Sequence, residues 1–323
     1  MCIKSRFLRE PAFLFSGFRY FWEKVNPMKK LSAQIFLLLF VFSSSVLLAQ
    51  ISHGTVQESL AMESKILHKT VHYTIYLPFD YFTSKRTYPV VYLLHGYSDD
   101  ETGWTQFGEA NRMADEGIAK GEIPPMILVT PDAGTSWYIN NYDGSVRYED
   151  FFFKEFIPYI ESHYHIRSGK SFRAVAGLSM GGYGALVYAM KHPGMFVACA
   201  PMSAAIRTDE QIINLSPQRW KAIESVVYGP GLKGKDRLTK LLIENDPLHL
   251  VQTSDVKKLR GVKYYIDCGD NDHVTIGNAT LHILMTQHHI PHTFIVRPGK
   301  HNWTYWRTGL PGALEFIGKA FIH

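Results

Sequence analysis

From residue 88 onward the sequence repeats one pattern: a short, almost uninterrupted apolar run closed by Gly or Pro, then a segment with an apolar stripe at helical spacing. Such runs are typical of strands buried on both faces of a parallel sheet. We expect strands at 88–96, 125–134, 172–180, 195–204, 262–269 and 292–299, and helices at 148–164, 181–192, 279–289 and 312–321. Strands that alternate with helices predict an α/β fold, with a mostly parallel central sheet and helices on both faces.

The part of the chain after residue 49 is expected to form a single domain. Residues 50–323 contain no Pro/Ser linker, low-complexity run or internal repeat. The segment 70–78 alternates polar and apolar residues, which predicts an edge strand exposed on one face. Residues 206–247 have mixed polarity and a Gly/Lys-rich piece, and we expect a helical insertion beside the functional site there rather than a second domain.

The charge of the chain is concentrated at its amino end. The whole sequence has 34 Lys+Arg and 29 Asp+Glu, a formal net charge of +5. Residues 1–49 contain seven of the basic and two of the acidic residues, so residues 50–323 carry 27 of each. Short basic runs at 233–240 and 257–263 contain or adjoin acidic residues and are better explained as solvated faces. A nucleic-acid partner is therefore not expected.

The amino-terminal segment has the order of parts of a secretory signal peptide. Met28 and two lysines precede an apolar run that ends at Ala49. We expect translation to start at Met28, cleavage near Ala49 and an exported protein, periplasmic or extracellular, that keeps no stable membrane span. A single membrane anchor over 31–49 is the alternative, because this run approaches the roughly 20 residues needed to cross a bilayer.

The sequence from Gly177 to Gly181 reads GLSMG and matches the pattern GxSxG. A strand-like run leads into it and a helical segment rich in small residues follows, which is the context that presents a nucleophilic serine on a sharp turn. The flanking glycines allow close packing around a strained backbone. We therefore expect Ser179 to be a catalytic nucleophile rather than part of an inert turn.

A nucleophilic serine needs a base and a group that orients the base. Three carboxylates follow the strand predicted at 262–269, namely Asp267, Asp270 and Asp272. Asp272 lies farthest into the loop and is best placed to reach across, with Asp270 as the second choice. His301 comes directly after the last predicted strand, at the edge of the sheet where catalytic groups collect in α/β folds, and is the expected base.

Attack on a carbonyl also requires N–H donors for the oxyanion. The N–H of Met180, at the start of the following helix, is one expected donor. The second is assigned to the N–H of Tyr97, at the end of the strand predicted at 88–96, where Gly96 lets the backbone turn into the site. His95 is expected to stabilise this loop rather than to take part in catalysis.

Neither a metal nor an organic cofactor is expected for this chemistry. The His-rich stretch near residue 288 has no His pair at helical spacing on an uninterrupted helix, because Pro291 separates His288 from His292. Cys199 and Cys268 both lie in strand-like runs, so buried free thiols are expected rather than a disulfide.

Five segments together resemble one group of enzymes: LLHGYSDDETGW, SWYINNYDGSVRYEDFFFKEFIPYIESHY, AGLSMGGYGALVYAMKHPGMF, YYIDCGDND and RPGKHNWTYWRTGLPGALEFI. They are similar to the esterase D/feruloyl-esterase-like group of α/β-hydrolases, which includes family 1 carbohydrate esterases, tributyrin-type esterases, S-formylglutathione hydrolases and mycobacterial mycolyltransferases. The resemblance covers nearly all of residues 70–321 and implies the α/β-hydrolase fold and a serine esterase. It implies the roles assigned above: Ser179 as nucleophile, Asp272 as acid, His301 as base, and Tyr97 and Met180 as oxyanion donors.

The expected export favours polysaccharide-linked acetyl or feruloyl esters, such as those of plant polysaccharides, over S-formylglutathione, which arises in the cytosol. A general short-chain carboxylesterase and an S-formylglutathione hydrolase-like thioesterase are the alternatives within the group. A catalytically silent carbohydrate-binding protein is the alternative from another class. Aromatic residues expected in loops near the site suit stacking on a sugar or a phenolic group, although any one of them could pack a loop base instead. They are Trp104, Trp137, Tyr138, Tyr142, Trp303 and Trp306.

Overall fold

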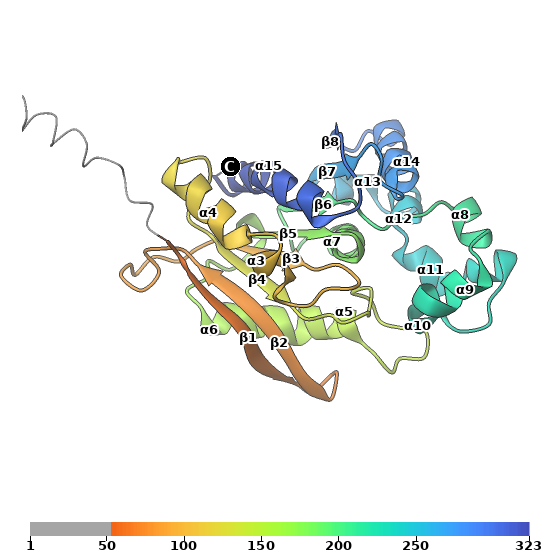
Figure 1. The fold of residues 1–323 in the computed structure, drawn as a ribbon, viewed down its shortest axis with the longest axis horizontal. Helices are drawn as coiled ribbons and strands as arrows, with labels where there is room; N and C mark the ends of the chain where they lie inside the picture. Colours follow the sequence, from red (N-terminus) through yellow and green to blue (C-terminus); the bar gives the residue numbers. More distant parts are fainter. Residues whose placement is uncertain (1–52, 323) are drawn as a thin grey trace, which may run out of the picture. The chain divides into compact units, whose positions relative to one another are not determined.

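The structure is a computed structural model that describes residues 53–322. Within this part of the chain, eight strands form one sheet in the order β1-β2-β4-β3-β5-β6-β7-β8 (Figure 1). The pairs β1·β2 and β2·β4 are antiparallel, and all other pairs are parallel. The leader, the start at Met28 and the cleavage near Ala49 lie outside the described residues. No helix in the described residues is long and apolar enough to cross a membrane.

The predicted parallel strands are all present. They are β3 (Val90–Leu94), β4 (Ile127–Pro131), β5 (Arg173–Leu178), β6 (Ala198–Met202), β7 (Lys263–Gly269) and β8 (His292–Arg297). Every residue of β3, β4, β5 and β6 is buried, because helices cover the sheet on both sides. Burial on both faces explains why these strands read as uninterrupted apolar runs. The predicted α/β fold is confirmed.

The expectation of an edge strand at 70–78 is wrong. This segment is β2 (Lys69–Leu77), which lies between β4 and β1 (Thr55–Ser64), so β1 is the edge. The polar alternation at the start of β2 has a different cause: β2 pairs with β4 only over 73–76, and its first residues extend past the end of β4. The strand β1 escaped prediction because its sequence, TVQESLAMES, is mostly polar and mostly exposed.

Helices pack on both faces of the sheet (Figure 1). One face is covered by α5 (Tyr148–Phe151), the π-helical turn η1 (Phe152–Phe156), α6 (Ile157–His163), α7 (Met180–Lys191), α12 (Pro247–Thr253) and α14 (Thr275–Gln287). The other is covered by α3 (Gly103–Gln106), α4 (Ala110–Ala119) and α15 (Trp303–Ile322). Helix α15 begins nine residues before the predicted start, because Pro311 lies inside it rather than before it.

Between β6 and β7 the chain forms short helical pieces. They are α8 (Asp209–Ile213), α9 (Pro217–Arg219), the π-helical turn η3 (Trp220–Glu224), α10 (Ser225–Tyr228), the 3₁₀ turn η4 (Gly234–Arg237), α11 (Lys240–Asn245) and, after α12, α13 (Val256–Leu259). Helices this short depend on their ends, and the side chains of Thr208, Ser216 and Thr239 accept backbone N–H bonds at three of the starts. Arg237 is buried and donates to three carbonyl groups at the end of α8.

Both cysteines of the described residues are free and buried, as the sequence predicts. Cys199 lies in β6 and Cys268 in β7, within the sheet. Burial raises the pKa of the Cys268 thiol to about 12. The thiol therefore stays protonated at neutral pH and acts as a small apolar side chain.

Candidate active site

Ser179 lies on the sharp turn between β5 and α7. Its backbone has φ 52° and ψ −116°, a conformation that side-chain-bearing residues rarely adopt. The turn is held from the neighbouring strand β6: the N–H of Ser179 donates to the carbonyl of Met202 at 3.0 Å, and its own carbonyl accepts from Ala205 at 3.0 Å. The surrounding structure thus keeps the strained residue in place, as is common where a side chain must be presented for chemistry.

The spacing of the two glycines in the motif follows from close packing. A Cβ atom on Gly177 would lie 2.5 Å from the carbonyl oxygen of Gly181. A Cβ atom on Gly181 would lie 2.3 Å from the carbonyl oxygen of Leu94, at the end of β3. Both contacts are too short for any side chain. Glycine at these positions lets β3, β5 and α7 meet at Ser179.

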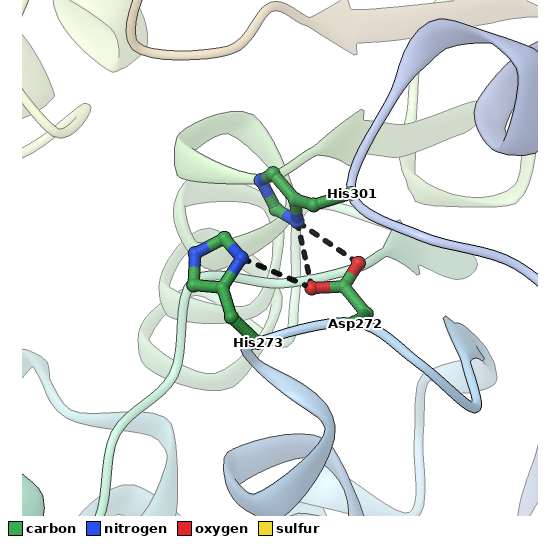
Figure 2. Close-up of side chains that lie close together, drawn as sticks. All are labelled: Asp272, His273 and His301. Atoms are coloured by element: carbon green, nitrogen blue, oxygen red, sulfur yellow. Dashed lines mark hydrogen bonds and ion pairs between the residues drawn. The ribbon is translucent and has the colours of Figure 1, made fainter.

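The structure brings together the three residues that the sequence selected for the triad. The Nε2 atom of His301 lies 2.8 Å from the Oγ atom of Ser179. The Nδ1 atom of His301 lies 2.9 Å from each carboxylate oxygen of Asp272 (Figure 2). Asp272 follows β7 and His301 follows β8, so both stand at the carboxyl ends of parallel strands, where the predicted topology puts them.

The structure also separates the three carboxylates considered for the acid. Asp267 is buried within β7 and pairs with Arg297 at 2.9 Å. Asp270 accepts a hydrogen bond from the backbone N–H of Gly299 at 3.0 Å and so joins the two loops. Of the three, Asp272 is the one that contacts the imidazole, and Asp270, the second choice, is turned to a structural role.

Asp272 is held in the ionised form. Its side chain is fully buried, and burial acts to raise the pKa of the carboxyl group. Hydrogen bonds from His301 and from the backbone N–H of Val274, at 3.0 Å, outweigh burial and leave the pKa below its usual value. A charged carboxylate at this position can fix one tautomer of His301 and stabilise the imidazolium form.

A second imidazole faces the same carboxylate. The Nδ1 atom of His273 lies 3.4 Å from Oδ1 of Asp272, and its ring centre lies 4.4 Å from that of His301 (Figure 2). The His273 side chain is 59% exposed. Burial of the ring and the proximity of His301 lower the pKa of His273. The sequence showed only that His273 adjoins Asp272; its approach to His301, 28 positions away, needs the fold.

The loop that carries Tyr97 is fixed by His95. The buried His95 ring lies 2.7 Å from the carbonyl of Gly96 through Nδ1 and accepts the N–H of Ala133 through Nε2 at 2.8 Å. This pattern assigns the neutral tautomer with the proton on Nδ1. A Cβ atom on Gly96 would lie 3.8 Å from Cβ of Ser179, so the loop passes beside the serine.

The two expected oxyanion donors are backbone groups with free hydrogen-bonding capacity. Met180 is the first residue of α7, and N–H groups in the first turn of a helix have no intrahelical acceptor. Tyr97 comes directly after Gly96, in the loop beside the serine. These positions suit donation to an oxygen bound at Ser179.

The aromatic residues predicted to contact substrate fall into two sets, and the first set packs behind the site. Trp104 is completely buried and its indole donates to the carbonyl of Leu94 at 2.9 Å, so its expected role in substrate binding is wrong. Trp303 and Trp306 lie in the first turn of α15 rather than in a loop. The Trp306 ring stands edge-on to His301 at 4.9 Å, which supports the imidazole from behind.

The second set consists of Trp137, Tyr138 and Tyr142, of which Trp137 and Tyr142 lie against the helical insertion. Trp137 contacts Tyr97 and Tyr183 with ring centres 6.3 and 5.3 Å apart. Tyr138 is buried, and its hydroxyl donates to the carbonyl of His95 at 3.1 Å. Tyr142 is 50% exposed, and its N–H donates to the carbonyl of Val227 in α10 at 2.9 Å.

A cavity lies between Trp137 and the insertion. It is lined by Trp137, Tyr183, Ala205, Arg207, Trp220 and Glu224, among others. Ser179 does not line the cavity; the contact between them is through the backbone, where the N–H of Ala205, a lining residue, bonds the carbonyl of Ser179. No motif or spacing in the sequence points to Arg207, Trp220 or Glu224. Trp220 and Glu224 belong to η3, and a π-helical turn has no clear sequence signature but is often found at functional sites.

A mostly parallel sheet with a serine, a histidine and a carboxylate in hydrogen-bond contact at its carboxyl edge defines an α/β-hydrolase with the geometry of a serine hydrolase. The Esterase family model matches residues 64–317, and the chain belongs to this family. The chain is similar to a solved ferulic acid esterase, with a TM-score of 0.72 and 32% identity over 83% of this chain and 99% of that one.

Two curated relatives are also named as esterases. An esterase of Mycobacterium tuberculosis is 35% identical over 175 residues, which is 51% of this chain. An endo-1,4-beta-xylanase/feruloyl esterase of Xylanibacter ruminicola is 31% identical over 190 residues, which is 57% of this chain. The matches span 37% and 25% of the lengths of these relatives, so each likeness is to one part of a longer protein.

Proposed function

We propose that the protein is a serine carboxylic-ester hydrolase that acts through an acyl-enzyme. The proposal rests on one observation, the continuous contact from Ser179 Oγ to His301 Nε2 at 2.8 Å and from His301 Nδ1 to Asp272 at 2.9 Å. A serine hydroxyl becomes an effective nucleophile when a neighbouring base takes its proton. Here the base is within reach of the hydroxyl, and the acid holds the base in the tautomer that can accept.

The reaction follows from these contacts. His301 takes the proton of Ser179 as Oγ attacks the ester carbonyl, and the N–H groups of Tyr97 and Met180 bind the oxyanion. His301 then gives the proton to the departing alcohol, which leaves the acyl group on Ser179. A water molecule, deprotonated by His301, attacks the acyl-enzyme and releases the acid.

The substrates proposed are polysaccharide-linked acetyl or feruloyl esters, met by the enzyme after export. Two observations support this choice: the likeness to a ferulic acid esterase at 32% identity and the xylanase/feruloyl esterase name of one relative. Of the aromatic residues expected to contact substrate, Trp137 is buried against Tyr97, and its indole N–H has no partner among the described residues.

The mechanism is tested by Ser179→Ala, with the exposed Ser162→Ala as the matched control. Loss of the nucleophile is expected to lower kcat on p-nitrophenyl acetate by about 10⁴- to 10⁶-fold, with Ser162→Ala unchanged. A fluorophosphonate probe is expected to label the wild type and not the Ser179→Ala variant. Wild-type activity in Ser179→Ala would refute the assignment, and a wild type that neither reacts nor turns over ester would favour a silent binding protein.

The substrate class is tested separately by the turnover of methyl ferulate, acetylated xylan and tributyrin. We expect kcat/KM for methyl ferulate or acetylated xylan to exceed that for tributyrin. A preference for tributyrin would overturn the polysaccharide assignment and indicate a general short-chain esterase, while leaving the mechanism intact.

A further inference from the structure

Asp272 lies between two imidazoles that come from two different loops. The Nδ1 atoms of His273 and His301 both face its carboxylate, at 3.4 and 2.9 Å (Figure 2). One donor atom from each of the three residues can be chosen so that all lie within 4.8 Å of one another. A catalytic triad needs a single imidazole on its carboxylate, so the esterase mechanism leaves His273 unexplained.

The spacing of these three donors fits a small tetrahedral cation. Zn²⁺ binds His nitrogen and carboxylate oxygen at about 2.0 to 2.2 Å, which puts neighbouring ligand atoms of a tetrahedron about 3.3 Å apart. The nitrogen-to-oxygen distances of 2.9 and 3.4 Å lie on either side of that value. Two of the three edges between the donors are therefore close to those of a zinc tetrahedron, and donor atoms of all three residues lie within 4.8 Å of one another.

The chemical type of the three donors and their accessibility to solvent also favour Zn²⁺ and similar ions. Two imidazole nitrogens and one carboxylate suit Zn²⁺ and its late first-row neighbours, whereas Ca²⁺ and Mg²⁺ require mostly oxygen ligands. Asp272 is also held by the N–H of Val274 at 3.0 Å, an outer contact of the type that orients metal ligands. The exposed ring of His273 gives an ion a route in from solvent.

The charged groups near the three donors are of both signs. Arg207 and Arg219 act electrostatically on His273. Both pair with the buried carboxylate of Glu224, at 3.1 and 3.8 Å, so one of their two charges is offset. The carboxylate of Asp272 is itself one of the three donors, and both imidazoles face it (Figure 2).

We propose that Asp272, His273 and His301 form a binding site for Zn²⁺ and that its occupation switches the esterase off. The inhibitory part rests on the proposed function. Zn²⁺ would bind His301 in the tautomer whose lone pair is on Nδ1, so the proton that Nδ1 donates to Asp272 is lost to solvent and Nε2 gains one. A neutral imidazole with metal on Nδ1 carries its proton on Nε2, so Nε2 has no lone pair for the proton of Ser179.

His273 distinguishes this site from an ordinary triad. Without it, the ion has only the carboxylate and one imidazole. The ring of His273 takes no part in the proposed reaction, and the inhibition of His273→Gln is expressed relative to the uninhibited rate of that same variant. A matched control exists in the insertion, where Asp209, Asp246 and His249 form the other three-donor group found among residues 53–322. The variant His249→Gln removes the imidazole of that group.

Binding is measured first, by calorimetric titration of ZnCl₂ into the full chain carrying Ser179→Ala, which keeps all three donors. Adding His273→Gln is expected to weaken binding at this site at least about tenfold, whereas adding His249→Gln leaves it unchanged. Equal affinity with and without His273 would overturn the site. This measurement needs no catalysis, so its outcome is independent of the proposed function.

Inhibition is measured next, on p-nitrophenyl acetate in a chelator-free buffer. Zn²⁺ is expected to inhibit the wild type and the His249→Gln variant alike, with full recovery on addition of EDTA. The His273→Gln variant should require at least about tenfold more Zn²⁺ for half-inhibition. Binding without inhibition of the wild type would overturn the switch, as would unchanged inhibition of His273→Gln.

Discussion

The two sides of the site are built in different ways. The side that holds the proposed triad Ser179, Asp272 and His301, called the catalytic side, consists of turns at the ends of β5, β7 and β8, and the sheet fixes the backbone on which each residue stands. The other side, at 206–247, consists of the continuous helical run of α9, η3 and α10 and of the short helices α8 and α11. Side-chain caps begin α8, α9 and α11, and buried groups such as Arg237 hold the pieces together.

The two sides therefore have different roles: one presents the triad, and the other packs beside it. On the catalytic side, the triad side chains are positioned by backbone packing, as at Gly181, where no Cβ atom fits. The insertion contributes buried apolar side chains to the core, and buried polar groups such as the Arg207–Glu224 pair lie among them. Changes on the catalytic side should therefore act on rate, and changes in the insertion should act first on stability.

The largest effect is expected from Asp272→Asn, which keeps the shape of the side chain and removes its charge. His301 then loses the partner that fixes its tautomer, and kcat on p-nitrophenyl acetate should fall by about 10⁴-fold while the protein stays folded. Steady-state kinetics with circular dichroism on the same samples measures both quantities.

Asp270→Asn is the matched control for this variant, because the amide oxygen can still accept the N–H of Gly299. Its kcat should stay within about threefold of the wild type. Two outcomes would contradict the role of the Asp272 carboxylate: Asp270→Asn as inactive as Asp272→Asn, or Asp272→Asn with a tenth of the wild-type activity. In either case the rate would not depend specifically on Asp272.

The second effect concerns stability and belongs to the insertion. Arg207 and Glu224 form an ion pair at 3.1 Å in which the side chains are 14% and 5% exposed. Glu224→Ala leaves the Arg207 charge buried without this partner, which is expected to lower the free energy of unfolding by about 3 to 5 kcal/mol. Urea denaturation gives this value directly.

The control for Glu224 lies in the same insertion. Lys240 and Glu244 also pair, at 3.6 Å, but their side chains are 87% and 57% exposed. Glu244→Ala should change the free energy of unfolding by about 0.5 kcal/mol or less. Equal losses in the two variants would mean that the buried pair gives the insertion no special support.

The contrast between the sheet edge and the insertion also explains which contacts could be predicted from the sequence. The triad residues could be selected because each follows a strand whose apolar run is visible, and parallel strands bring their carboxyl ends to one edge. The motif around Ser179 is read from neighbouring residues alone. Strand β1 could not be found, because it is polar and owes its place to pairing with β2.

Outside the triad, side-chain neighbours from distant segments were beyond prediction. Trp104 follows Tyr97 by seven positions, so the sequence places it near the site. In the structure it packs into the core under α15. The pairing of Arg207 with Glu224 joins the end of one loop to a π-helical turn, and no spacing rule connects them. His273 and His301 meet only because β7 and β8 are adjacent in the sheet.

The smallest of the three effects is a pH dependence within the insertion. Asp246 is 5% exposed and caps α12 by accepting the N–H of Leu248 at 2.7 Å. Burial raises the pKa of Asp246 to about 6, although the Leu248 N–H and the charge of His249 act against it. The pKa of an unfolded Asp is about 3.9, so between about pH 4 and pH 6 the folded state holds a proton that the unfolded state has lost.

Because the folded state binds more protons in that range, the stability of the wild type should fall as pH rises from about 4 to 6 and then level off. Asp246→Asn keeps an oxygen for the cap and carries no charge at any of these pH values. It should be about 1 to 3 kcal/mol more stable than the wild type at pH 7.5 and equal to it at pH 4, as measured by urea denaturation. The exposed cap Asp255, which accepts the N–H of Lys257 at 2.9 Å, gives the control: Asp255→Asn should shift stability by the same small amount at both pH values. If Asp246→Asn behaved like Asp255→Asn, the buried charge of Asp246 would not lower the free energy of unfolding. The insertion would then be stabilised mainly by backbone packing, as the catalytic side is.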